Sequence, residues 1–371
     1  MRYNNIVDRK LIRNIDIGIV VTTMILIIIG IIGVASATQV TSGGSTKFIT
    51  IQMIAFVLGI IAVLFLLMID YNSFGDMHTA IYIINILLLL SVLFIGSEIK
   101  GSKSWIDLGP MNFQPSEIVK IGFILTFAKH LEARKDKLNS IKDISISIIY
   151  ILVPVALIFM QKDTGTALVF LFISAIMLFA AGINYKYIIG AIGAFIVSSP
   201  LMWFFLQPYQ KNRILVFLNP EMDPRGKGYH VIQSKTAIGS GQFFGEGLFN
   251  GTLNNSGFIP ERHTDFIFSV LGEELGFIGA VIVIVLFAIL LLRCIHIAKA
   301  AKDTYGMLIC VGITAMYLFH VLENIGMTIG VMPVTGIPLP FISYGGSSLL
   351  TNIIAIGLVL NIGMRRQVIR F

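Results

Sequence analysis

Long apolar runs separated by short polar stretches dominate the hydrophobic pattern of this chain. Runs of roughly 20 apolar residues are typical of membrane-spanning helices. By this length criterion the pattern predicts about ten spans. The predicted spans are Ile17–Val34, Phe48–Ile69, Thr79–Gly96, Ile118–Ala128, Ile144–Met160, Ala167–Ile183, Tyr187–Leu206, Leu275–Leu292, Met307–Ile329 and Leu349–Ile362.

These runs predict an all-α polytopic membrane protein in which residues 1–371 form one integral-membrane domain. The first run, Ile17–Val34, is longer than the roughly 7–15 residues of a signal-peptide core, so we expect a retained first helix. The longest connection, 207–265, joins the seventh and eighth spans. Long connections are usually functional or disordered, and the aromatic and aliphatic residues of this one favour an ordered loop.

Lysine and arginine gather at one end of the predicted spans. Cytoplasmic loops of membrane proteins carry an excess of these residues, so the distribution predicts that both termini lie in the cytoplasm. The basic groups are Arg2, Arg9, Lys10, Arg13, Arg134, Lys135, Lys137, Lys186, Arg293, Lys299, Lys302, Arg365, Arg366 and Arg370. The outer face then receives three segments rich in Gly and Pro, which are 98–117, 207–265 and 330–348.

The composition agrees with a membrane protein and excludes several other classes. Hydrophobic residues make up 56% and charged residues 13% of the chain, whereas soluble proteins carry about 25% charge. The net charge of +7 comes from basic residues at helix ends, so it does not indicate nucleic-acid binding. The two cysteines, Cys294 and Cys310, have neither metal-binding spacing nor a disulfide pattern. HExxH, GxSxG and phosphate-loop motifs are absent from the sequence, which argues against ordinary proteases, hydrolases and ATPases.

Titratable residues crowd into the stretch "PERHTDFIF", at the end of the long outer connection. A carboxylate at Asp265 would lie beside the membrane surface, where it could accept a proton from a hydroxyl of a lipid-anchored substrate. General base catalysis of this kind contributes about 10²–10⁴-fold. The alternative is structural and equally weighted by spacing alone: Asp265 caps a helix N-terminus, while Glu261 and His263 are solvated loop residues.

The stretch "QPSEIVK" places Glu117 and Lys120 three residues apart, on the same side of a helix. A capping pattern, with Ser116 as the cap and Glu117 favoured by the helix dipole, is the structural alternative. That alternative does not explain Lys120, a cation just inside an apolar span. Ionisable residues inside a membrane are costly and by default indicate function.

Two further segments supply candidate chemistry. In "PLPFISYGGSS" the prolines and glycines prevent a helix, and non-helical backbone at membrane depth usually lines a cavity, to which Ser343 would offer a hydroxyl. The alternative is a surface hairpin. The outer connection carries cations that could bind a diphosphate. In the structural alternative, these cations only balance the negative charges of Glu221, Asp223 and Glu246. These cations are Lys211, Arg213, Lys227 and Lys235.

Glu273 and Glu274 interrupt the apolar run between Gly272 and Gly276. We therefore expect the spanning helix to start near Leu275. Residues 266–272 would form a shallow or re-entrant piece at the outer boundary.

The chain resembles the SEDS family (shape, elongation, division and sporulation) over nearly its whole length. The resemblance rests on "GSKSWIDLGPMNFQPSEIVK", "QKDTGTA", "YQKNRI", "DPRGKGYHVIQSKTAIGSG", "IPERHTDFIFSVLGEELGFIG" and "NIGMTIGVMPVTGIPLPFISYGGSS". The Arg in "ERHTDFIF" and the short termini resemble the elongation branch more than the division branch, and the sporulation branch is close to both.

The resemblance implies a peptidoglycan glycosyltransferase with ten transmembrane helices, which polymerises lipid II, an undecaprenyl-linked disaccharide-peptide, at the outer face of the cytoplasmic membrane of a bacterium. It also implies partners: a class B penicillin-binding protein, whose helix we expect on the eighth and ninth spans, and other membrane proteins of the elongation complex. No nucleic acid is expected.

The resemblance assigns residues as well. The family's essential Asp falls on Asp265, its Ser-Glu-x-x-Lys pattern on Ser116, Glu117 and Lys120, and its Pro-Asp-x-Gly-Thr-Ala element on 162–167. Lys162 stands where that element usually has Pro, which puts the shape of the turn in question but not Asp163. The expected substrate-binding residues are Glu117, Lys120, Arg213, Lys235, Asp163, His263 and Ser343.

Both lines of reasoning lead to one mechanism, in which Asp265 is the general base and cations stabilise the departing diphosphate. An α donor linkage and a β product require one inversion, as in inverting glycosidases. The mechanism would also accommodate a divalent cation, Mg²⁺ or Mn²⁺, which the sequence does not prove. The rival hypotheses are a lipid II flippase, since paired broken helices are typical of transporters, and a scaffold without chemistry.

Overall fold

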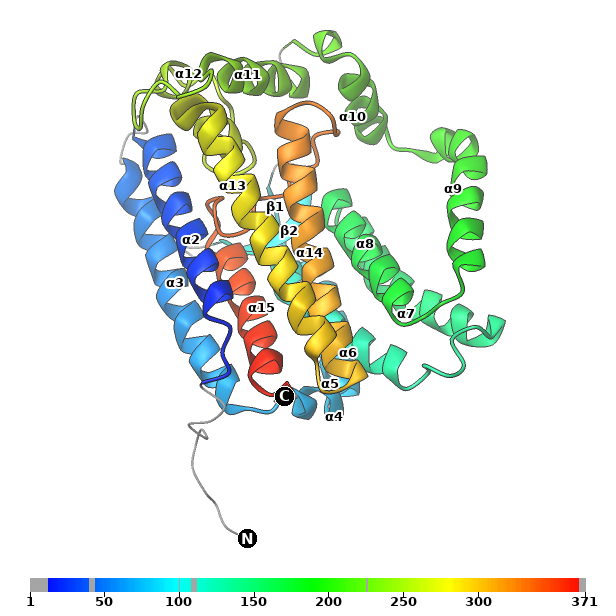
Figure 1. The fold of residues 1–371 in the computed structure, drawn as a ribbon. Coiled ribbons are helices and arrows are strands. Elements are labelled where there is room, and N and C mark those ends of the chain that lie inside the picture. Colours follow the sequence, from blue (N-terminus) through cyan, green and yellow to red (C-terminus); the bar gives the residue numbers. More distant parts are fainter. Residues whose placement is uncertain (1–12, 40–43, 100, 108–111, 225, 367–371) are drawn as a thin grey trace.

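The computed structural model describes residues 13–39, 44–99, 101–107, 112–224 and 226–366. Each apolar run predicted from the sequence lies in a helix of this structure (Figure 1). These helices are α2 (Ile17–Thr38), α3 (Gly44–Met68), α5 (His78–Ile95), α6 (Pro115–Glu132), α7 (Ile141–Met160), α8 (Thr164–Ala180), α9 (Tyr185–Phe205), α13 (Ile267–Ala300), α14 (Thr304–Thr328) and α15 (Gly346–Met364), with the short α4 (Asn72–Asp76) after α3.

Within the described residues, 7 helices are long and apolar enough to cross a membrane. The prediction of a helical multi-pass membrane protein is confirmed, while the number of spans stays a prediction. Two of the remaining predicted spans differ from the others in an evident way. Helix α8 is shorter, with 17 residues, and α6 carries two oppositely charged pairs, Glu117 with Lys120 and Lys129 with Glu132.

Helices α14 and α15 form the centre of the bundle. In the most apolar stretches of α14 and α15, 72% and 83% of the residues are buried inside the protein. In those of α3 and α5 the share is 17%. Close approach of backbones supports this packing, as is common between membrane helices. At Gly30 of α2, for example, a Cβ atom would lie 2.5 Å from the carbonyl oxygen of Phe341. The first helix therefore packs directly on the segment that precedes α15.

The segment 97–113 forms a small antiparallel sheet that the all-α prediction did not include. Its strands are β1 (Ser97–Ile99), β2 (Ser102–Asp107) and β3 (Asn112–Phe113), in the order β1-β2-β3. The sheet is tied to the bundle, since the backbone N–H of Lys103 donates to the carbonyl oxygen of Gln161 at 3.0 Å.

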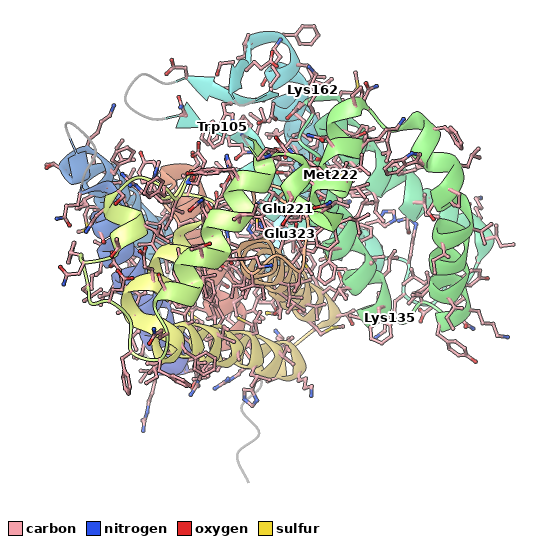
Figure 2. The ribbon with its side chains drawn as sticks, turned by 90° about the horizontal axis from the view of Figure 1, so that it is seen from above. Trp105, Lys135, Lys162, Glu221, Met222 and Glu323 are labelled. Carbon is pink, nitrogen blue, oxygen red and sulfur yellow. The ribbon has the colours of Figure 1, made fainter. Side chains whose placement is uncertain are left out.

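The long connection 207–265 is largely helical. It contains α10 (Pro208–Leu218), the 3₁₀ turn η1 (Pro220–Met222), α11 (Lys227–Ser240) and α12 (Thr252–Asn255). These elements lie over one end of the bundle, opposite the end where α2 begins and α15 ends (Figure 1). Figure 2 views the molecule from above and shows them lying across that end, with Glu221 and Met222 among them.

Helix α13 consists of two helical pieces that meet at Gly276. This residue has φ 66° and ψ −165°, which interrupts the helix. A Cβ atom at Gly276 would lie 2.3 Å from the backbone nitrogen of Gly245, so the close approach requires glycine. The predicted break near Leu275 is confirmed. Residues 267–274 are all buried inside the protein, and the predicted shallow or re-entrant placement of residues 266–272 stays a prediction.

Candidate functional site

Helix α6 begins with a buried ion pair. Lys120 Nζ lies 2.8 Å from Glu117 Oε1, and the two residues are 2% and 4% exposed. The helix starts at Pro115 with Gln114 at the N-cap position, because proline suits the first helical position. The capping role considered for Ser116 is therefore wrong, and the Ser116 hydroxyl has no hydrogen-bond partner among the described residues.

Sequence reasoning missed two residues of α14 that meet this ion pair and Asp265. His320 Nε2 lies 3.1 Å from Lys120 Nζ. Asn324 donates from Nδ2 to the carbonyl oxygens of Asp265 at 2.9 Å and Ile337 at 2.8 Å. The signal available in the sequence was spacing: His320, Glu323 and Asn324 lie three and four apart on one helix face, inside an apolar run.

Asp265 lies at the start of α13, facing the segment between α14 and α15. Helix α13 begins at Ile267, and its N-cap position is held by Phe266 rather than Asp265. A Cβ atom at Gly336, where φ is +81°, would lie 3.4 Å from Asp265 Oδ2. The carboxylate therefore lies beside a stretch of backbone that has no side chain at Gly336.

Asp163 caps α8 next to the same region. Its carboxylate accepts hydrogen bonds from the Thr166 N–H at 3.1 Å, the Thr166 hydroxyl at 2.9 Å and Gln114 Nε2 at 3.0 Å. Burial raises the pKa of Asp163, and the hydrogen bonds from Thr166 and the nearby Lys120 charge oppose this. Lys162 has φ 61°, a left-handed conformation that proline cannot adopt. The turn before Asp163 therefore differs from one built on proline.

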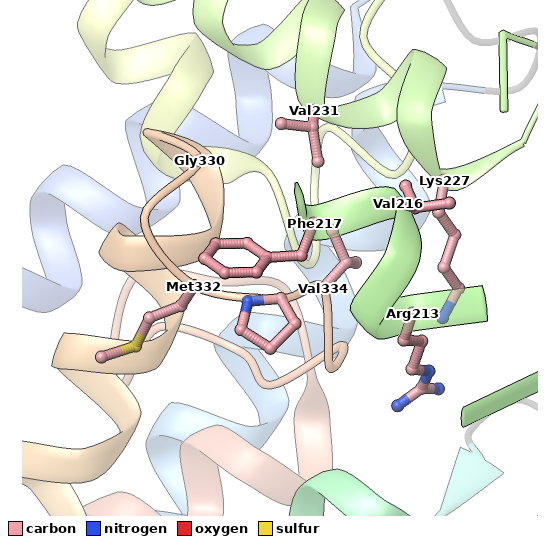
Figure 3. A pocket seen from close by; sticks show the side chains of 9 residues that line it. Arg213, Val216, Phe217, Lys227, Val231, Gly330, Met332 and Val334 are labelled. Atoms are coloured by element: carbon pink, nitrogen blue, oxygen red, sulfur yellow. The ribbon is translucent and has the colours of Figure 1, made fainter. Parts of the chain in front are cut away.

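Two cations of the outer connection line a recess between α10, α11 and the segment after α14. Arg213 Nη1 donates to the Thr164 hydroxyl at 2.9 Å, beside Asp163. Figure 3 shows the charged ends of Arg213 and Lys227 on the same side of the recess, which Val334 also lines. The recess encloses about 10 Å³, about the space of one water molecule, so it is narrow rather than sugar-sized.

Lys227 links this recess electrostatically to Asp265. Burial and, to a smaller extent, the Arg213 charge lower the pKa of Lys227 to about 8, while the Asp265 charge opposes both. Lys227 thus lies within reach of the charges of Arg213 and Asp265. The predicted cation Lys235 lies at the edge of the recess, since a Cβ atom at Gly330 would be 3.1 Å from Lys235 Cδ.

The other two predicted substrate contacts have partners within the protein. The Ser343 hydroxyl donates to the carbonyl oxygen of Thr264 at 2.7 Å and accepts from the Leu339 N–H at 2.8 Å. The ring of His263 packs 5.0 Å from that of Phe48 and 5.6 Å from that of Tyr344. Ser343 therefore holds the backbone next to Asp265, and the substrate-binding role predicted for both residues stays a prediction.

Glu273 and Glu274 anchor α12, and Glu274 also accepts from the Phe249 N–H of the preceding loop at 3.2 Å. Glu273 accepts from the backbone N–H groups of Leu253 at 2.6 Å and Asn254 at 3.1 Å. Glu274 accepts from Asn254 Nδ2 at 3.0 Å and from the Ser36 hydroxyl. These two carboxylates interrupt the apolar run because they satisfy the polar groups of a loop packed against it.

The described part of the chain holds no group of three His, Cys, Asp or Glu side chains able to bind a metal ion by themselves. Mg²⁺ is commonly bound by one or two carboxylates together with substrate phosphates.

Comparisons with known proteins agree on one family. The family model for FtsW, RodA and SpoVE, described as a cell cycle protein, matches residues 17–368. Peptidoglycan glycosyltransferase MrdB of Escherichia coli (strain K12) is 41% identical over 290 residues, covering 78% of each protein. A chain from a peptidoglycan synthase complex, solved to study the coordination of polymerization and crosslinking, superposes with a TM-score of 0.82 at 34% identity, covering 94% of this chain and 97% of that one.

The rod shape determining protein RodA of Thermus thermophilus superposes with a TM-score of 0.71 at 29% identity, covering 95% of this chain and 97% of that one. The family model, over residues 17–368, and the two structures, over 94% and 95% of this chain, thus indicate the same family.

Lys227 is expected to lose its proton near pH 8, whereas an ordinary lysine does so near pH 10.4. Acylation of its amine, followed by mass spectrometry across this pH range, should reach half its maximum near pH 8. Arg213→Met removes a charge that opposes protonation and should raise this midpoint. A midpoint of about 10 in the parent protein would contradict the burial of Lys227 that lowers its pKa.

Proposed function

The chain belongs to the FtsW, RodA and SpoVE family of cell cycle proteins, and we propose that Asp265 is the general base with which it polymerises lipid II. Its activity is that of a peptidoglycan glycosyltransferase in a bacterial membrane. We place the reaction at the outer face of the cytoplasmic membrane, during cell elongation and the maintenance of cell shape.

One observation carries this proposal: the Asp265 carboxylate lies beside the backbone at Gly336, and its charge acts on the cation Lys227. A glycosyl transfer needs both a base and a cation. The base takes the proton of the acceptor hydroxyl, whose oxygen attacks the anomeric carbon of the donor. The bond from that carbon to the diphosphate breaks, and the diphosphate leaves with the electron pair. One in-line displacement inverts the configuration, so no covalent glycosyl-enzyme is required.

The negative charge that develops on the diphosphate calls for fixed cations. Arg213, Lys120 and Lys235 are our candidates, and the first two are held in place by hydrogen bonds to Thr164 and Glu117. Glu117 and Asp163 would support these cations rather than react. A divalent cation bound by the diphosphate oxygens is a compatible addition.

A class B penicillin-binding protein is the partner we propose, because the matched synthase complex couples polymerization with crosslinking. Its single helix would pack on α13 and α14. The proposal is supported by the apolar outer side of α13, where Phe277, Ile278, Val281 and Ile282 are exposed. Membrane helices associate by close packing. Other membrane proteins of the elongation complex would join the same assembly.

Asp265→Asn keeps the size of the side chain but removes the base. Glycan synthesis by purified protein with its partner and lipid II should fall by about 10²-fold or more. Glu117→Gln should reduce activity less, because that carboxylate only holds Lys120. Glu221→Gln, an exposed carboxylate of the same outer connection, is the matched control and should leave activity unchanged.

Synthesis by Asp265→Asn within a few-fold of the parent would end the catalytic assignment. Reconstituted vesicles separate the rival function. Labelled lipid II that crosses the bilayer, with no glycan formed by the parent protein, would identify a flippase instead.

The orientation is tested by a cysteine at Ser256, which is exposed at the end of the bundle covered by the outer connection. The native Cys294 and Cys310 are buried and should not react. A membrane-impermeant thiol reagent added to intact spheroplasts should label Ser256→Cys fully. Labelling only after the membrane is opened would invert the proposed topology and place the site on the wrong side for lipid II polymerisation.

The partner surface is tested by photocrosslinking from α13. A crosslinking amino acid at Ile282 should capture the penicillin-binding protein, whereas one at Ile61, equally apolar and exposed on α3, should not. Capture at Ile61 alone would move the docking site from α13 to α3.

A further inference from the structure

Helix α14 buries two polar side chains one turn apart on the same face. His320 is 2% exposed and Asn324 is 0% exposed, and a spacing of four residues brings them to one side of the helix. Burying such groups costs free energy unless they are hydrogen-bonded. The hydrogen-bond partners of His320 and Asn324 therefore indicate the role of these two buried side chains.

His320 joins the Lys120 ion pair to the segment before α15. Its Nδ1 lies 3.2 Å from the carbonyl oxygen of Pro338, which can only accept a hydrogen bond. Nδ1 therefore carries the hydrogen, and Nε2 presents its lone pair to the Lys120 ammonium at 3.1 Å. This is the arrangement of a neutral imidazole that donates at one nitrogen and accepts at the other. Lys120 is thereby held by Glu117 on one side and His320 on the other.

Asn324 joins the same segment to Asp265. Both hydrogens of its amide nitrogen are used, one by the carbonyl oxygen of Ile337 and the other by that of Asp265. Because Ile337 and Pro338 are consecutive, the two α14 side chains hold neighbouring carbonyl groups of one stretch of backbone. A continuous chain of contacts thus runs from Lys120 through His320, residues 337–338 and Asn324 to Asp265.

We propose that His320 and Asn324 form a bracket of positioning residues that sets the place of the Lys120 cation relative to the Asp265 base. The inference rests on the proposed function, since it matters only if these two groups act on one substrate. Misplacing a reacting group by about 1 Å can cost about 10²-fold in rate. A rigid helix carrying both contacts is suited to holding that geometry.

His320→Gln and His320→Leu form the first test. The glutamine amide can still donate to Pro338 and accept from Lys120, whereas leucine does neither. The leucine variant should lose about 10²-fold in kcat with KM for lipid II nearly unchanged, because positioning acts in the transition state. The glutamine variant should restore kcat to within about tenfold of the parent.

Asn324→Asp and Asn324→Ser form the second test. The aspartate has the shape of asparagine but only accepts when ionised, so it would face two carbonyl oxygens without a donor. Serine keeps one donor. We expect kcat to fall in the order parent, serine variant, aspartate variant. Thr314→Val is the matched control, since this buried α14 hydroxyl bonds only to the Cys310 carbonyl of its own helix among the contacts described.

Thermal unfolding in detergent and binding of the partner should be recorded for every variant. Folded His320→Leu and Asn324→Asp proteins with parental kcat would overturn the bracket, as would a folded but inactive His320→Gln. If the leucine variant does not fold, the glutamine and serine variants decide by the same criteria. Asp265→Asn, assayed in parallel, separates the bracket from the proposed base. If Asp265→Asn is inactive while the His320 and Asn324 variants are fully active, only the bracket is refuted. If Asp265→Asn is active, the proposed role of Asp265 as base is refuted.

Discussion

A cation buried among membrane helices needs partners supplied by the protein, because hydrocarbon offers none. Lys120 meets this constraint through Glu117 in its own helix and His320 in α14. The second partner commits α14 to lie against the start of α6. It also commits residues 337–338 to lie beside α14, since His320 needs an acceptor for its other nitrogen. The position of Asp265 follows through Asn324, so one buried charge helps to order the part of the bundle where these residues meet.

Much of this region was predictable from local spacing. Glu117 and Lys120 are three residues apart on a helix, and the break at Gly276 follows two carboxylates and a glycine inside an apolar run. The start of α6 was missed by two residues, with Ser116 considered as the cap instead of Gln114. Pro115 carried the signal, because proline favours the first helical position. His320 and Asn324 could not be assigned in this way. Their importance comes from partners distant in the sequence, and a polar residue in an apolar run does not reveal its partner.

The same distinction holds for the fold. The apolar runs predicted every long helix because their signal is local and repeated over many residues. The sheet at 97–113 was not predicted, since its strands are short and depend on contacts such as the one from Lys103 to Gln161. Serine at 343 illustrates the same limit within the site. Its hydroxyl suggested a substrate contact, which stays a prediction, but its hydrogen bonds to Thr264 and Leu339 were not readable from the sequence.

The separation of 200 residues between Lys120 and His320 has a consequence for biogenesis. Synthesis at roughly 5–20 residues per second means that Lys120 emerges about 10–40 seconds before the imidazole that completes its coordination. During that interval the nascent α6 must enter the bilayer with Glu117 as the one partner present in its own first turn. The pair at three-residue spacing thus neutralises the ammonium during insertion, and the distant histidine fixes its orientation once α14 has followed.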